Sequence, residues 1–219
     1  MKTVVDRFLR YVQVDTESVP EADCFPSSEK QKNLAAILVE ELKEMGVEDA
    51  RMDSYGYVYA TIPPTTDKEL PAIGLIAHMD TSSAVSGKDV KPRIVENYDG
   101  GDILLNEAQN IVLKTEDYPE ILDYKGQDII VTDGTTLLGA DDKAGVSEIM
   151  TLCDFLMNNS VTHGTIKIAF TPDEEVGRGV NYFDVEGFGA EFAYTVDGGE
   201  LGELEYENFN AASLKLTVN

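Results

Sequence analysis

Short apolar runs that alternate with helical patterns constrain the fold of this chain more than any other feature. Four runs have the length and composition of strands: 72–77, 129–131, 165–170 and 192–196. The first is apolar throughout, which is typical of a strand buried on both faces of a sheet. Because helical patterns separate these runs, the sequence predicts an α/β fold with a largely parallel central sheet.

Three segments have apolar residues at the spacing of amphipathic helices. The first covers residues 3–13. The second is predicted to be capped by Ser27 or Ser28 and to end at Gly46. The third presents a buried side that runs from Val146 to Met157.

Other segments are less regular. Residues 55–60 alternate as a half-buried strand does, and residues 81–128 read as an irregular insertion with a hairpin or two. Residues 213–218 alternate again and predict a further strand at the end of the chain.

The charge of the chain excludes several classes of partner. There are 17 Lys and Arg against 41 Asp and Glu, for a formal net charge of −24. Such a surface repels phosphate backbones and anionic lipids, so we expect neither a nucleic acid nor a membrane as a binding partner. No run approaches the ~20 apolar residues of a membrane span, and the N-terminus has no apolar signal-peptide core. Cys24 and Cys153 predict free thiols and a cytoplasmic location.

Acidic or histidine side chains follow the predicted strands, some directly and Asp141 after a turn. They are His78, Asp80, Asp141, Glu174, Glu175 and Asp197. Ligands of open α/β sheets bind at the carboxyl ends of parallel strands, so these side chains are expected to converge on one edge. Imidazole and carboxylate together suit zinc or a similar divalent ion.

The chemistry of such a site needs more than ligands. A carboxylate can bridge two ions, which together polarise a carbonyl and acidify a shared water. One member of the pair Glu174 and Glu175 can then ligate while the other takes the proton of the water. Asp80 is placed to accept the proton of the non-ligating nitrogen of His78.

Simpler interpretations of the same residues remain open at this point. Asp197 begins an ordinary turn sequence, and Asp141 precedes a helix that it could cap. Glu174 and Glu175 could belong to a solvated loop. His163 precedes a glycine in a loop without a partner motif, and we interpret it as an exposed residue without a catalytic role.

Four motifs together resemble a known family: residues 77–81, 138–145, 171–177 and 196–199. They resemble the metallopeptidases related to aminoacylase and glutamate carboxypeptidase, and within these the tripeptide aminopeptidases. The long insertion after His78 and the stretch Glu96-Asn97-Tyr98 favour that branch. The resemblance implies a three-layer, zinc-exopeptidase-like sandwich.

The resemblance also implies a role for each site residue. His78 and Asp197 would hold one zinc, Asp141 would bridge two zincs, and Glu175 would hold the second. Glu174 would be the general base, and Asp80 would orient His78. The peptide between Asp141 and Asp142 would be cis.

The implied activity is release of the N-terminal residue from tripeptides by attack of a zinc-bound hydroxide. A related dizinc carboxypeptidase or amide deacylase is an alternative, and so is a non-catalytic metal- or peptide-binding fragment. Relatives have a further histidine ligand and a lid domain that this sequence lacks. We therefore expect residues 1–208 to form the N-terminal part of the catalytic domain and 209–219 the truncated first strand of the lid. The resemblance implies that the parent enzyme is a homodimer joined through this lid. The chain alone is expected to be inactive or weakly active.

Overall fold

The computed structural model describes residues 2–199, 201–207, 212, 214 and 216. The helices are α1 (Val4–Tyr11), α2 (Gln31–Glu44), α3 (Ala140–Asn158) and α4 (Val185–Phe188), with a 3₁₀ turn η1 at Pro119–Tyr124. The strands are β1 (Arg51–Met52), β2 (Val58–Ile62), β3 (Ile73–His78), β4 (Arg93–Val95), β5 (Ile103–Asn106), β6 (Ile111–Leu113), β7 (Ile129–Val131), β8 (Ile166–Thr171) and β9 (Phe192–Thr195).

The central sheet has the strand order β1-β2-β8-β3-β9. Strand β3 pairs in parallel with β8 on one side and with β9 on the other. Strand β2 runs antiparallel to both β8 and β1. The parallel register places His78 opposite Thr171, so β3 and β8 end at the same edge of the sheet. The predicted α/β fold with a mostly parallel sheet is confirmed.

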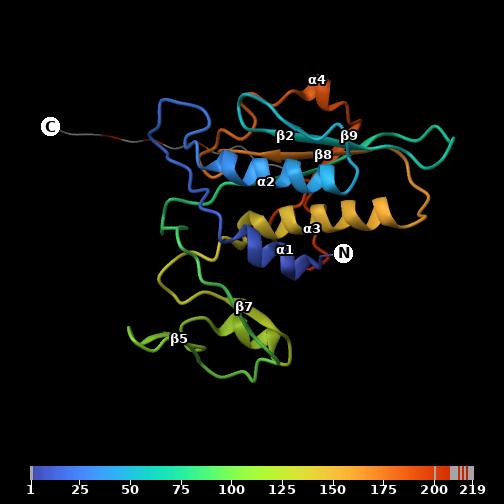
Figure 1. The fold of residues 1–219 in the computed structure, drawn as a ribbon. Coiled ribbons are helices and arrows are strands. Elements are labelled where there is room, and N and C mark those ends of the chain that lie inside the picture. The colour runs from blue at the N-terminus through green and yellow to red at the C-terminus, as the bar shows by residue number, and fades with distance from the viewer. Residues whose placement is uncertain (1, 200, 208–211, 213, 215, 217–219) are drawn as a thin grey trace.

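Helices α1, α2 and α3 lie on one face of the sheet, and the short α4 lies on the other (Figure 1). The main core fills the space between the three long helices and the sheet, where Leu34, Leu38, Val146 and Phe170 are fully buried. The opposite face is covered by an aromatic cluster around Tyr57, Tyr59, Phe183 and Phe188. Because β3, β8 and β9 run in parallel, their carboxyl ends lie together at one edge of the sheet.

Residues 93–131 form a small lobe beside α1, away from the central sheet (Figure 1). The lobe contains the β5–β6 hairpin and the antiparallel pair of β4 and β7. The prediction that 129–131 joins the parallel sheet is therefore wrong. Strand β3 already has a neighbour on each side, and Val131 packs instead with Tyr98 and Ile103 in the core of the lobe.

Two local predictions also need correction. The strand placed at 55–60 begins only at Val58, because Asp53 accepts hydrogen bonds from the N–H groups of Tyr55 and Tyr57 and holds a turn there. The second helix begins at Gln31, and its cap residue Lys30 makes no side-chain capping bond. The side chain of Ser27 bonds to Asp173 instead of a helix end.

The strand expected at 213–218 and the domain boundary expected at 208 and 209 lie outside the described residues. Within the described part of the chain, no helix has both the length and the apolar character needed to cross a membrane.

Candidate metal centre

The carboxyl ends of three parallel strands bring most of the candidate residues to one edge. His78 is the last residue of β3, and Asp197 follows the end of β9 by two residues. Glu174 and Glu175 follow β8 across a short turn. Asp141 arrives differently, because the strand that precedes it belongs to the lobe. It reaches the edge from the first turn of α3.

The start of α3 is shaped to project Asp141 away from the helix. Gly139 has a left-handed conformation with φ of 76°, and Asp141 itself is non-helical. The peptide bond between Asp141 and Asp142 is cis, as the resemblance implies. The buried carboxylate of Asp142 accepts hydrogen bonds from the N–H groups of His78 at 3.0 Å and Gly145 at 3.1 Å. Asp142 thereby ties the start of α3 to the end of β3.

Three carboxylates surround the Nε2 atom of His78. The Oδ1 atom of Asp141 lies 2.8 Å from Nε2. Oxygens of Glu174 and Asp197 lie at 3.8 and 3.9 Å from the same nitrogen. One ligand atom each from His78, Asp141 and Asp197 fits within 4.8 Å of the others. Since His78 is buried while Asp141 is largely exposed, this group opens to solvent on one side.

The other ring nitrogen of His78 faces Asp80. The Nδ1–H group donates to the backbone carbonyl of Asp80 at 3.0 Å, and the Asp80 carboxylate lies 3.5 Å away. That carboxylate is fully buried and accepts the N–H groups of Glu174 at 2.9 Å and Glu175 at 3.2 Å. Asp80 therefore contacts both the imidazole and the turn that carries the two glutamates.

The pKa values of several residues in this group are raised, by burial and by the charges of their neighbours. Burial alone would lower the pKa of His78, but the neighbouring carboxylates, above all Asp80, raise it to about 10. Burial and then the charge of Asp197 raise the pKa of Asp142 to about 8. Burial also raises the pKa values of Glu174 and Glu175, and the charge of Asp141 is the next largest cause at Glu175.

The donor set fits a divalent metal. With Nδ1–H bonded to the Asp80 carbonyl, the uncharged ring presents Nε2 as a lone-pair donor to the space between Asp141 and Asp197. One imidazole and two carboxylates are ligands that zinc accepts, with room for a further ligand. The carbonyl bonded to Nδ1 fixes the tautomer that a metal requires. A divalent ion there would also neutralise the repulsion among these acids.

Two buried acids were not recognised in the sequence. Asp142 stands beside Asp141 in the sequence, but its hydrogen-bond partner His78 lies 64 residues away. Asp173 is fully buried and bonded to Ser27 and Gln31, far back in the chain. Neither has a local pattern that distinguishes it from an acid in a solvated loop.

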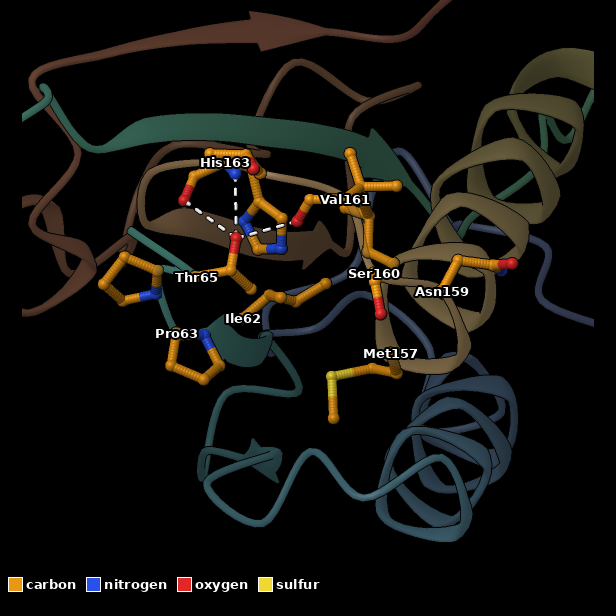
Figure 2. A pocket seen from close by; sticks show the side chains of 11 residues that line it. Ile62, Pro63, Thr65, Met157, Asn159, Ser160, Val161 and His163 are labelled. Atoms are coloured by element: carbon orange, nitrogen blue, oxygen red, sulfur yellow. Dashed lines mark hydrogen bonds between the residues drawn. The ribbon is translucent and has the colours of Figure 1, made fainter. Parts of the chain in front are cut away.

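His163 lies far from this centre. It lines a pocket at the end of β2 with Pro63 and Val161, where Thr65 bonds to its backbone (Figure 2). Residue Ile62 of β2 pairs with Ile166, the first residue of β8, so this pocket lies at the opposite edge of the sheet. The Nδ1 atom of His163 is hydrogen-bonded to the backbone carbonyl oxygen of Gly164, 2.8 Å away.

Comparisons with known proteins give the chain its relatives. No family model matches it. Peptidase T of Clostridium novyi is 61% identical over the whole chain, and peptidase T of Desulfitobacterium hafniense is 62% identical. The chain is a homologue of peptidase T. It corresponds to the N-terminal part of these curated relatives and spans about half their length, 54% and 53%.

Solved structures with the same fold include PepT relatives. The aminopeptidase PepT of Bacillus cereus is 28% identical, with a TM-score of 0.64 over 90% of this chain and 43% of that one. A tripeptidase from Staphylococcus aureus is 26% identical, with a TM-score of 0.63 over the same shares. The α/β fold found here is thus the fold of a large part of two peptidases.

Proposed function

We propose that this chain carries the metal centre of an aminopeptidase that releases the N-terminal residue of tripeptides. One observation carries the proposal: the carboxylates of Asp141, Glu174 and Asp197 converge on the Nε2 atom of a buried histidine. Carboxylates gathered this closely repel one another, and a divalent cation between them would relieve the repulsion, so the cluster has a physical reason to bind metal. The peptidase T relatives and the two solved peptidases support the hydrolytic reaction.

We assign zinc as the metal, with two ions in the complete site. His78, Asp141 and Asp197 would hold the first ion, and Asp141 and Glu175 would contribute to the second. Bound zinc supplies a polarised substrate carbonyl and a water molecule of lowered pKa. The Asp80 carbonyl would keep the imidazole of His78 in the tautomer that ligates.

Glu174 is our candidate for the general base. Its carboxylate lies beside the metal ligands, 3.8 Å from Nε2 of His78, and burial raises its pKa. A base whose pKa is closer to neutral exchanges protons more effectively at physiological pH. Glu174 would accept a proton from the attacking water and deliver it to the amine of the leaving peptide.

We infer a short peptide as substrate and the cytosol as the compartment. The net charge of −24 disfavours nucleic acid and anionic membranes as partners. Both cysteines are free thiols, which agrees with a reducing environment.

The test is hydrolysis of the tripeptide Leu-Ala-Gly, with added zinc, by the full-length gene product. The proposal predicts free leucine as the first product. Free glycine would indicate a carboxypeptidase instead, and zinc binding without hydrolysis would indicate a binding module. The three different residues make the cleaved end readable from the products.

The two glutamates should separate by role in the same assay. Glu174→Ala should lower kcat by at least about 10²-fold, because a base is lost, while zinc content stays at the wild-type level. Glu175→Ala should lower the zinc content as well, measured by elemental analysis. Glu44→Ala on the exposed surface of α2 makes the same charge change and should alter neither. The opposite pattern at 174 and 175 would reverse the assignment.

A further inference from the structure

The turn that carries Glu174 and Glu175 is held from behind by a second buried carboxylate. Asp173 is fully buried and has a left-handed backbone with φ of 58°. Its Oδ1 atom accepts from the side chains of Ser27 at 2.5 Å and Gln31 at 2.7 Å. Its Oδ2 atom accepts from the Ser27 N–H at 2.7 Å and from Arg178 at 3.0 Å.

The backbone of Asp173 is fixed as firmly as its side chain. Its N–H donates to the side-chain oxygen of Gln31 at 3.1 Å, so these two residues exchange two hydrogen bonds. Its carbonyl accepts the N–H of Arg178 at 2.9 Å. The turn is therefore linked to the first residue of α2 and to the loop that precedes it.

The opposite side of the turn rests on Asp80, which accepts the N–H groups of Glu174 and Glu175. Two fully buried carboxylates thus hold three successive residues of the backbone. Side chains on the turn cannot shift relative to His78 without breaking several of these charge-assisted hydrogen bonds. Gly179 adds a close contact, since a Cβ built there would lie 3.3 Å from the Cα atom of Glu174.

We propose that Asp173 is a positioning residue that places the carboxylate of Glu174 for proton transfer. The inference rests on the proposed function, in which Glu174 is the base. The carboxylate of Asp173 accepts hydrogen bonds from Ser27, Gln31 and Arg178, none of which is a proposed metal ligand. Its effect on Glu174 therefore passes through the backbone. Gln31 and Ser27 share this role because they supply three of the four hydrogen bonds to the carboxylate.

Reversal of one hydrogen bond tests the proposal. Asp173→Asn places an amide donor against the amide donor of Gln31, and Gln31→Glu places two carboxylates together. In the double variant the new amide donates to the new carboxylate, which still accepts the N–H of residue 173. The two single variants should lower kcat, by about 10²-fold for Asp173→Asn, since a displacement near 1 Å can cost that much. KM should change little, and the double variant should recover most of the loss.

Amide hydrogen exchange supplies a readout that does not depend on activity. Exchange at Glu174 and Glu175 should accelerate in Asp173→Asn and slow again in the double variant. Leu156→Ala, at the far end of α3, should lower the melting temperature without altering kcat or exchange at this turn. If Asp173→Asn does not fold, Ser27→Ala removes one of the four bonds and should lower kcat less strongly.

The outcomes separate the two proposals. Full activity of Glu174→Ala would refute the assignment of the base and, with it, the proposed function of the turn. An inactive Glu174→Ala together with wild-type kcat in Asp173→Asn would overturn the positioning role alone. Failure of the double variant to recover kcat or exchange protection would also overturn it.

Discussion

A buried ionic cluster joins the three long helices, and its disruption should be among the most costly single changes in the protein. Arg7 of α1 is 1% exposed. It donates at 2.8 Å to Glu41 of α2 and at 2.8 Å to Asp154 of α3. It also donates to the carbonyl of Lys2 and the hydroxyl of Thr151.

Arg7→Met removes the cation but keeps much of the apolar stem. Glu41 would retain Arg10 and the hydroxyl of Tyr11 as partners. Of the partners in the described part of the chain, the Asp154 carboxylate would retain only the amide of Asn158, although Asp154 is just 6% exposed. Removal of one partner from a buried ion pair typically costs about 3–5 kcal/mol. That is a large fraction of the roughly 5–15 kcal/mol by which folded domains are stable.

The assay is urea unfolding followed by circular dichroism, with the free energies extrapolated to water. Lys30→Met is the matched control, because Lys30 pairs with Asp15 at 3.0 Å on the surface. The control should cost no more than about 1 kcal/mol. Arg7→Met combined with Asp154→Leu should recover much of the loss, since the uncompensated charge is gone. A loss below about 1 kcal/mol for Arg7→Met alone would show that Arg7 contributes no more than an exposed ion pair.

Three further outcomes are expected. Asp80→Ala should weaken zinc affinity or turnover about 10–100-fold by calorimetry and peptide hydrolysis, and unchanged values would leave Asp80 as a loop residue only. In chelator-treated protein, the fold raises the pKa of Asp142 from 3.8 to about 8, so the folded chain keeps a proton that the unfolded chain releases. The free energy of unfolding should therefore fall as pH rises between these two values. Asp142→Asn should therefore lose less melting temperature than wild type between pH 5 and pH 8, and equal losses would contradict the shift. The 219-residue chain alone should hydrolyse Leu-Ala-Gly poorly, because the second zinc ion has few ligands among its described residues, and His163→Ala should not change that rate. Turnover as fast as that of the complete enzyme would show that residues of this chain complete the site.

Much of the fold could be predicted because its signals are local. The apolar run that ends at His78 predicts a strand with covered faces, and β3 has neighbours on both sides. Residues 129–131 misled the prediction, because three apolar residues fit a lobe as well as a central sheet. Tyr55 alternates with Tyr57 like a strand, but a turn around Asp53 intervenes.

The site divides in the same way. His78, Glu174 and Asp197 could be placed at one edge, since each follows a strand and parallel strands end together. The supports behind them could not be predicted, because they depend on pairs far apart in sequence. Asp173 bonds to Ser27 across 146 residues, and no local pattern records such a contact.

Zinc titration by calorimetry, on this chain and on its His78→Ala and Asp197→Ala variants, tests whether these residues hold a metal ion. One zinc should bind tightly and a second weakly or not measurably, because among the described residues only Asp141 and Glu175 are assigned to the second ion. Tight binding should weaken as pH falls, since a proton with a pKa of about 10 at His78 competes with the metal. Both variants should lose the tight site. Wild-type affinity in either variant, or two equally tight sites in the unaltered chain, would contradict this assignment.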